Sequence, residues 1–255
     1  MEGIKNLSIV VPAYKQQKTI KRDIKVLKKV LKRIGIPYEI IVVVDGRLDK
    51  TYERASRMRS KTVRVLGYRE NKGKGYAVQY GASKTRGDVI GFIDSGMDID
   101  PNGISMLLHH MVWYDADIIV GSKLHPVSQV HYPLQRRILS WGYRRIIRLF
   151  FGLTVRDTQA GLKLFKRKVV NDVFPRLLVK TFAFDIEVLS VAHRLGYSRI
   201  FDAPIKLNFD PLNTSLTSRK VLKQVYYMFR DTVAVFYRLK IIRYYDKKLK
   251  YYKKL

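Results

Sequence analysis

The feature that most constrains the fold is a regular alternation of short apolar runs with amphipathic runs through the first half of the chain. The apolar runs have the length of β-strands and lie at 7–13, 38–44, 62–66, 88–93 and 117–121. Helices are predicted between them, at 19–34, 49–58, 76–84 and 101–114, with Gly87 as the stop of the third. Strands that alternate with helices in this way predict an α/β fold, with a mostly parallel central sheet flanked by helices.

One of these strands ends in a cluster of acidic residues. The stretch from Asp88 to Pro101 is apolar up to Ile93, and Asp94, Asp98 and Asp100 follow. Because open α/β sheets bind ligands beyond the carboxyl ends of their strands, we expect these aspartates at the mouth of a site. Asp100 stands before a proline, a position typical of a turn former or a helix cap.

A loop rich in glycine and lysine, Asn71–Gly75, precedes the third helix. Backbone amides in such a loop could cradle a phosphate. The loop lacks a Walker signature, however, so a plain helix-entry loop is the alternative.

The second half of the chain is less regular. It predicts a loop at 126–133, a basic amphipathic helix at 135–151, a strand within 157–165, a helix at 184–195 and a strand at 200–209. From residue 217 onward, apolar side chains occupy one face of a helical pattern and lysine and arginine crowd the rest. This tail fits a packed helix, a subunit contact or a helix on a membrane surface, and we favour the membrane. We expect a catalytic domain at 1–210 and a basic amphipathic C-terminal helical appendage at 211–255.

Net charge narrows the class of partner. The 255 residues carry a formal charge of +29, which indicates a polyanionic partner such as nucleic acid or an anionic membrane surface. The chain has no cysteine, which excludes disulfides and thiolate metal sites. We see no secretory signal and no run of the ~18 to 20 apolar residues that a membrane span needs. The expectation is therefore a peripheral protein at the cytoplasmic face of a membrane.

Eight short motifs occur in a recognisable order. They are Val11–Tyr14, Glu39–Gly46, Asn71–Gly75, Asp94–Pro101, Gly121–Lys123, Arg136–Ser140, Asp157–Phe165 and Phe182–Glu187. In this order they resemble family 2 glycosyltransferases, and among these the polyprenyl-phosphate (dolichol-phosphate) mannose or glucose synthases. The resemblance covers roughly residues 7 to 210.

The resemblance implies a GT-A fold and transfer of a hexose, with inversion, from a nucleoside diphosphate sugar of the GDP-mannose or UDP-glucose type to a polyprenyl or dolichyl phosphate. It also implies Mg²⁺ or Mn²⁺, ions that suit carboxylate ligands and stabilise a departing diphosphate. An acceptor phosphate is already a nucleophile at neutral pH. Cationic residues that position it then matter more than a general base.

The family's functional residues can be carried over position by position. The resemblance implies a donor site of Pro12, Tyr14, Asp45, Lys74 and Asp94, a metal held by Asp94 and Asp98, an acceptor site of Lys123, Arg136 and Ser140, and a catalytic set of Asp94, Arg136 and Asp157. Gly96 stands where the family's second metal-binding carboxylate is usual, and Lys123 replaces an arginine. Further departures from the family pattern are Gln16, Val44 and Asp210.

Other functions stay open at this point. A transferase acting on a sugar hydroxyl would need a base such as Asp157 or Asp185. A basic nucleic-acid-binding protein is a second alternative, although no RRM, KH or zinc-finger pattern is present, so no specific nucleic acid is expected. An inactive homologue that serves as a partner subunit is a third. A membrane-protein partner or a homo-oligomer is compatible with each of these readings.

Overall fold

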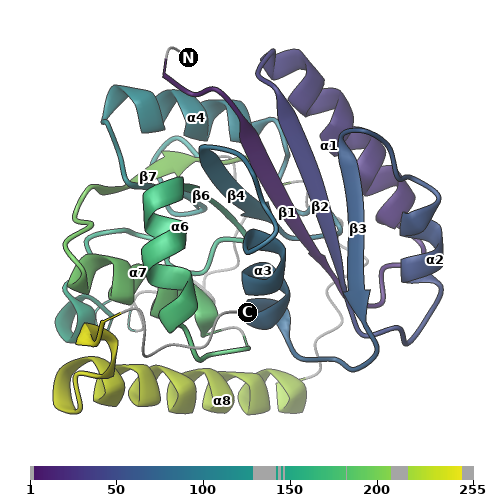
Figure 1. The fold of residues 1–255 in the computed structure, drawn as a ribbon. Helices are drawn as coiled ribbons and strands as arrows, with labels where there is room; N and C mark the ends of the chain where they lie inside the picture. Colours follow the sequence, from purple (N-terminus) through teal and green to yellow (C-terminus); the bar gives the residue numbers. More distant parts are fainter. Residues whose placement is uncertain are drawn as a thin grey trace.

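In the part of the chain that the structure describes, a seven-stranded sheet forms the core of the protein (Figure 1). The computed structural model describes residues 3–128, 142, 145, 147–181, 183–207 and 218–248, with side chains omitted at 218–226. The strands are β1 Leu7–Ala13, β2 Tyr38–Asp45, β3 Val63–Tyr68, β4 Val89–Ile93, β5 Ile118–Ser122, β6 Leu162–Lys166 and β7 Ile200–Pro204. Their order across the sheet is β3-β2-β1-β4-β6-β5-β7.

Pairing in the sheet is parallel except at β6. Strands β1, β2, β3 and β4 pair in parallel, and so do β5 and β7. Strand β6 lies between β4 and β5 and is antiparallel to both. The predicted α/β class with a mostly parallel sheet is confirmed.

Helices cover both faces of this sheet. They are α1 Ile20–Ile34, α2 Thr51–Ser56, α3 Lys74–Ala82, α4 Gly103–Trp113, α6 Arg167–Val173 and α7 Phe184–Arg194, with a short 3₁₀ turn η1 at Phe174–Arg176. Residues 147–151 are also helical, which is the described end of the predicted helix at 135–151. Figure 1 shows α3, α6 and α7 in front of the sheet and α1 and α4 behind it.

Two predicted boundaries were wrong. Helix α3 begins at Lys74 and ends at Ala82, so Gly87 does not stop it. Gly87 instead packs against the backbone beside β1, where an added Cβ would lie 2.8 Å from Asn6 O and Ser8 N. Strand β7 ends at Pro204 rather than at 209.

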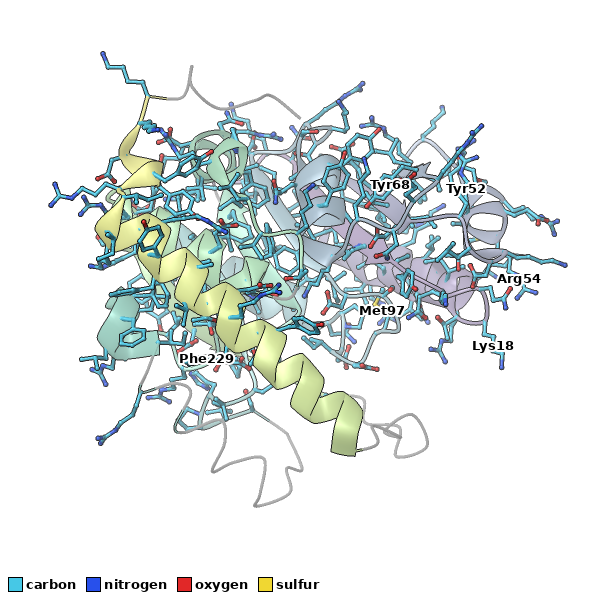
Figure 2. The ribbon with its side chains drawn as sticks, turned by 90° about the horizontal axis from the view of Figure 1, so that it is seen from below. Lys18, Tyr52, Arg54, Tyr68, Met97 and Phe229 are labelled. Carbon is cyan, nitrogen blue, oxygen red and sulfur yellow. The ribbon has the colours of Figure 1, made fainter. Side chains whose placement is uncertain are left out.

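The C-terminal part of the chain crosses the end of the molecule at which the parallel strands finish (Figures 1 and 2). Helix α8 spans Ser218–Phe236 and continues into a π-helical turn, η3 Tyr237–Ile241, and a 3₁₀ turn, η4 Tyr244–Asp246. Helix α8 contacts α7, and Tyr245 in η4 is completely buried. No helix among the described residues is long and apolar enough to cross a bilayer.

Candidate active site

A cavity of about 790 Å³ opens where β1, β2 and β4 end. The structure brings all five predicted donor-site residues to its wall: Pro12, Tyr14, Asp45, Lys74 and Asp94. The rest of the lining comes from Ala13, Gln16, Asn71, Gly73, Ser95, Thr181, Ala183, Tyr227, Met228, Arg230 and Asp231. Tyr14 is 44% exposed, so an aromatic side chain is available to a planar ligand.

Asp45 at the end of β2 organises the loop before α3. One of its carboxylate oxygens accepts a hydrogen bond from Lys72 N at 2.7 Å, and the other accepts from Gly73 N and Asn71 Nδ2, both at 2.9 Å. Asp45 is buried, and both of its carboxylate oxygens accept hydrogen bonds from this loop. Asp45 thus holds the loop Asn71–Gly75, the candidate phosphate cradle, in place, and Gly73 within it adopts a φ of +95°.

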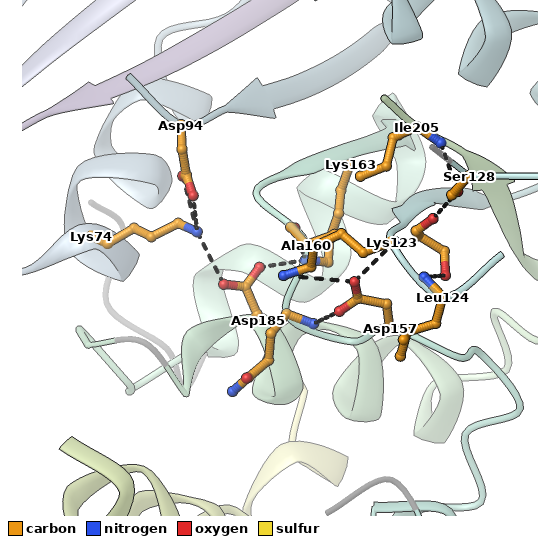
Figure 3. A network of polar contacts seen from close by, with 12 residues as sticks. Lys74, Asp94, Lys123, Leu124, Ser128, Asp157, Ala160, Lys163, Asp185 and Ile205 are labelled. Carbon is orange, nitrogen blue, oxygen red and sulfur yellow. Dashed lines mark hydrogen bonds and ion pairs between the residues drawn. The ribbon is translucent and has the colours of Figure 1, made fainter. Parts of the chain in front are cut away.

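A buried network of alternating charges lies at the base of the cavity (Figure 3). Lys74 Nζ lies 3.0 Å from Asp94 Oδ2 and 3.2 Å from Asp185 Oδ2. The other oxygen of Asp185 accepts from Lys163 Nζ at 2.5 Å, and Lys163 also donates to Ala160 O. Lys163 is fully buried, so its ammonium depends on these partners.

The charges in this network determine whether its Asp185 and Lys74 side chains are ionised. Burial raises the pKa of Asp185, but the ammonium groups of Lys163 and Lys74 outweigh that effect and hold the pKa below its usual value. Burial lowers the pKa of Lys74, and the carboxylates of Asp185 and Asp94 reverse the shift, so the net pKa is raised. Both groups are therefore ionised at neutral pH, and Lys74 presents a fixed cation to the cavity beside Asp94.

Glycine 161 leaves room for the Asp94 carboxylate. Gly161 O accepts a hydrogen bond from Asp94 N at 2.9 Å, which places the two residues side by side. A Cβ at position 161 would lie 2.1 Å from Asp94 Oδ2, far inside van der Waals contact. The Asp94 side chain is 46% exposed, so the carboxylate faces the cavity as well as Lys74.

Asp98, the second predicted metal ligand, shares a negative environment with Asp94. Burial raises the pKa of Asp98, and the neighbouring charges of Asp94 and Asp23 raise it further. A cation between such carboxylates relieves this repulsion, and Mg²⁺ and Mn²⁺ prefer oxygen ligands. Asp94 and Asp98 are therefore compatible with a divalent ion between them, although Asp98 is not among the residues that line the cavity. The described part of the chain contains no group of three or more His, Cys, Asp or Glu side chains arranged around one metal position.

Asp100 has the structural role that the sequence predicts for it, which is to form a turn. Its Oδ1 accepts hydrogen bonds from Asn102 N at 2.9 Å and Asn102 Nδ2 at 2.8 Å, just before α4. It is a turn-forming residue.

Asp157 and Lys123 lie together and are not among the residues that line the cavity. Lys123 N donates to Asp157 Oδ2 at 3.1 Å, and Lys123 Nζ lies 3.8 Å from the same oxygen. The other oxygen of Asp157 accepts from Gln159 N at 3.1 Å. Arg136, Ser140 and Asp210 lie outside the described residues, so the acceptor site is described only in part.

Several residues of the cavity wall were not predicted from the sequence. Thr181 precedes α7, and Tyr227, Met228, Arg230 and Asp231 come from α8. Thr181 Oγ1 donates to Asp231 Oδ2 at 2.7 Å, which ties the two elements together.

The sequence could have pointed to the buried ion pair of Lys163, because a lysine inside an apolar strand is rarely buried without a partner.

Comparison with known proteins places the sequence in a family. The model of the family described as glycosyl transferase family 2 matches residues 8–174. A dolichyl-phosphate beta-glucosyltransferase of Drosophila melanogaster is 34% identical over 74% of this chain and 63% of its own length. The Homo sapiens protein of the same name is 31% identical over 83% of this chain and 69% of its own length. The Dictyostelium discoideum protein of that name is 29% identical over 86% of this chain and 73% of its own length.

Solved structures share the fold at lower identity. Glucosyl-3-phosphoglycerate synthase of M. tuberculosis aligns with a TM-score of 0.66 and 20% identity, over 91% of this chain and 80% of the other. The same enzyme in complex with Mn²⁺, UDP and glucosyl-3-phosphoglycerate aligns with a TM-score of 0.63 and 19% identity, over 91% and 79%. Mannosyl-3-phosphoglycerate synthase of Rubrobacter xylanophilus aligns with a TM-score of 0.67 and 16% identity, over 97% and 78%.

Proposed function

The chain belongs to glycosyl transferase family 2, and we propose that it transfers a hexose, with inversion, from a nucleoside diphosphate sugar to a polyprenyl or dolichyl phosphate. The relatives named dolichyl-phosphate beta-glucosyltransferase support the acceptor class and favour a glucose donor of the UDP-glucose type. Pro12, Tyr14 and Asp45 would form the nucleotide end of the donor site, and Lys74 would attract the diphosphate.

The surroundings of the two candidate bases, Asp157 and Asp185, are the reason that we favour a phosphate acceptor. Both oxygens of Asp185 are occupied by ammonium groups, which keep its pKa low, and both oxygens of Asp157 accept backbone hydrogen bonds. A carboxylate held ionised by cations is a poor proton acceptor. A phosphate acceptor needs no base, so this arrangement favours a lipid phosphate over a sugar hydroxyl.

The remaining roles follow from charge. Lys123, with Arg136 and Ser140, would hold the acceptor phosphate in line with the sugar. Asp94 and Asp98 would hold Mg²⁺ or Mn²⁺, which stabilises the negative charge of the leaving diphosphate when bound. The fixed ammonium of Lys74 adds positive charge at the same end of the cavity.

We further propose that the protein acts as a peripheral protein on an anionic membrane at its cytoplasmic face. Phe229, Tyr237 and Ile241 are exposed side chains of α8 and η3, and Figure 2 shows Phe229 on the outside of α8. The net charge of +29 favours anionic headgroups. In this proposal residues 1–210 form the catalytic domain, and residues 211–255 attach it to the membrane while α8 also walls the cavity.

A paired-acceptor assay tests the proposed function. The purified protein is incubated with UDP-glucose or GDP-mannose, Mn²⁺ and either a short polyprenyl phosphate or the corresponding polyprenol, and released nucleoside diphosphate is measured. We expect turnover with the phosphate alone, and loss of turnover on chelation of the metal. Turnover with the polyprenol, or none with any donor by folded protein, would contradict the proposal.

A further inference from the structure

Tyr245, near the C-terminal end of the described chain, is buried against α7 rather than exposed. Among the described residues, Tyr245 is the largest side chain that is fully buried. Its hydroxyl donates to Glu187 Oε1 at 2.5 Å. A tyrosine hydroxyl is costly to bury without a partner, so this hydrogen bond fixes how η4 docks.

Glu187 is a buried acid that the proposed chemistry does not use. Its carboxylate accepts hydrogen bonds from Leu178 N at 3.0 Å and Val179 N at 2.8 Å in addition to that from Tyr245. Arg238 Nη1, in the π-helical turn η3, lies 3.8 Å from the same carboxylate. Glu187 therefore joins the C-terminal turns to the backbone of residues 178–179.

The segment 178–181 in turn supports the loop that begins α3. Lys180 O accepts a hydrogen bond from Gly75 N at 2.8 Å. The two backbones approach so closely that a Cβ at Gly73 would lie 2.3 Å from Lys180 O, and one at Gly75 would lie 2.6 Å from Val179 O. Gly73 and Lys74 line the cavity, so a shift of the segment 178–181 would move the cavity wall.

We propose that Tyr245 is a positioning residue for the donor: through Glu187 and the segment 178–181 it holds Gly73–Gly75 and Lys74 in the geometry that binds the diphosphate. This inference rests on the proposed function. It gives the C-terminal turns a role in donor affinity, separate from any role at a membrane. Loss of the hydrogen bond from Tyr245 to Glu187 should weaken donor binding without altering acceptor binding.

The test compares Tyr245→Phe with Asp246→Asn. Tyr245→Phe keeps the ring and removes only the hydroxyl that contacts Glu187. Asp246→Asn weakens the adjacent ion pair with Arg194, whose side-chain atoms meet at 2.6 Å, and leaves Glu187 untouched. Hydrogen exchange in peptides covering 71–80 and 177–181 reports the coupling without any substrate. Steady-state kinetics then give KM for the sugar nucleotide and the lipid phosphate separately.

We expect Tyr245→Phe to accelerate exchange in both peptides and to raise the donor KM by up to about tenfold, the upper end of what one ordinary intramolecular hydrogen bond contributes. The acceptor KM should not change, and Asp246→Asn should match the wild type in both measurements. Glu187→Gln should reproduce the effect on exchange.

Two results would overturn the inference. One is unchanged exchange at 71–80 in Tyr245→Phe; the other is a lower melting temperature with an unchanged donor KM, which would mark Tyr245 as structural alone. Failure of the proposed function looks different: the wild type would then show no turnover with a lipid phosphate, while the effect of Tyr245→Phe on exchange would persist.

Discussion

Gly161→Ala is expected to disable the site by displacing one carboxylate. The added Cβ would lie 2.1 Å from Asp94 Oδ2 and 2.6 Å from Asp94 Cγ. Because the Asp94 backbone is hydrogen-bonded to Gly161 O, the side chain rather than the strand must move. Restoring a van der Waals separation of about 3.2 Å requires a displacement of about 1 Å, which also lengthens the contact with Lys74.

A displacement of that size sets the expected magnitude. Misplacement of a reacting group by about 1 Å can cost about 10²-fold in rate, equivalent to about 2.7 kcal/mol of transition-state stabilisation. The cost to folding should be smaller, about 1 kcal/mol, since the Asp94 side chain is 46% exposed and has open space to enter. The assay is nucleoside diphosphate release at saturating acceptor, with the melting temperature measured in parallel.

Gly87→Ala is the matched control for this prediction. Its Cβ would also overlap backbone, at 2.8 Å from Ser8 N, but it lies before the first residue of β4 and thus at the opposite end of that strand from Asp94. We expect it to lower the melting temperature and leave kcat/KM of the folded protein unchanged. Wild-type kcat/KM in Gly161→Ala would refute the assignment of Asp94 to the reaction, and equal losses in both variants would trace the effect to general destabilisation.

Further predictions concern charge and surface. Asp185→Asn should destabilise the protein by about 3 to 5 kcal/mol, because it removes the charged partner of the fully buried Lys163, whose pKa burial already lowers. Since the folded-state pKa of Asp185 is lowered, its contribution is fully present above the usual value of 3.8 and is lost as pH falls through the folded pKa, so urea titrations should converge for the two proteins in strong acid. Equal differences at pH 7 and at pH 2 would contradict that reasoning. Replacing Phe229 in α8 and Ile241 in η3 by serine should reduce flotation with anionic vesicles. Leu48→Ser, at a residue that is 56% exposed and lies outside these elements, should not. Equal flotation of the wild type and both variants would exclude α8 and η3 from the membrane contact.

Local sequence patterns predicted the parts of this fold that depend on local periodicity. Each of the first five strands and the helices between them lies within a few residues of its predicted position, because apolar runs and helical spacing report burial directly. The grouping of Tyr14, Asp45 and Asp94 at one cavity also follows from a general rule, since parallel strands end at the same edge of a sheet.

The parts that the sequence did not predict depend on long-range contacts. Nothing local shows that β6 inserts between β4 and β5, or that Lys163 meets Asp185 on α7. The amphipathic pattern of α8 shows that one face is apolar, but it does not say which surface covers that face. Only the tertiary arrangement places Met228 and Asp231 in the wall of the cavity.

Gly96 shows how a departure from a motif acquires a physical meaning. In the sequence it is a missing carboxylate. In the structure it has a φ of +92°, a conformation that strains any residue with a side chain, and Met97 follows with a φ of +56°. Gly96 N donates to Asp23 Oδ2 at 3.0 Å, which fixes this turn against α1. The turn leaves Asp98 close enough to Asp94 for the charge of Asp94 to raise the Asp98 pKa. Position 96, where the family pattern has an acid, is thus occupied by a glycine that the turn requires, and the carboxylate proposed to assist Asp94 with a divalent ion is Asp98, two residues further on.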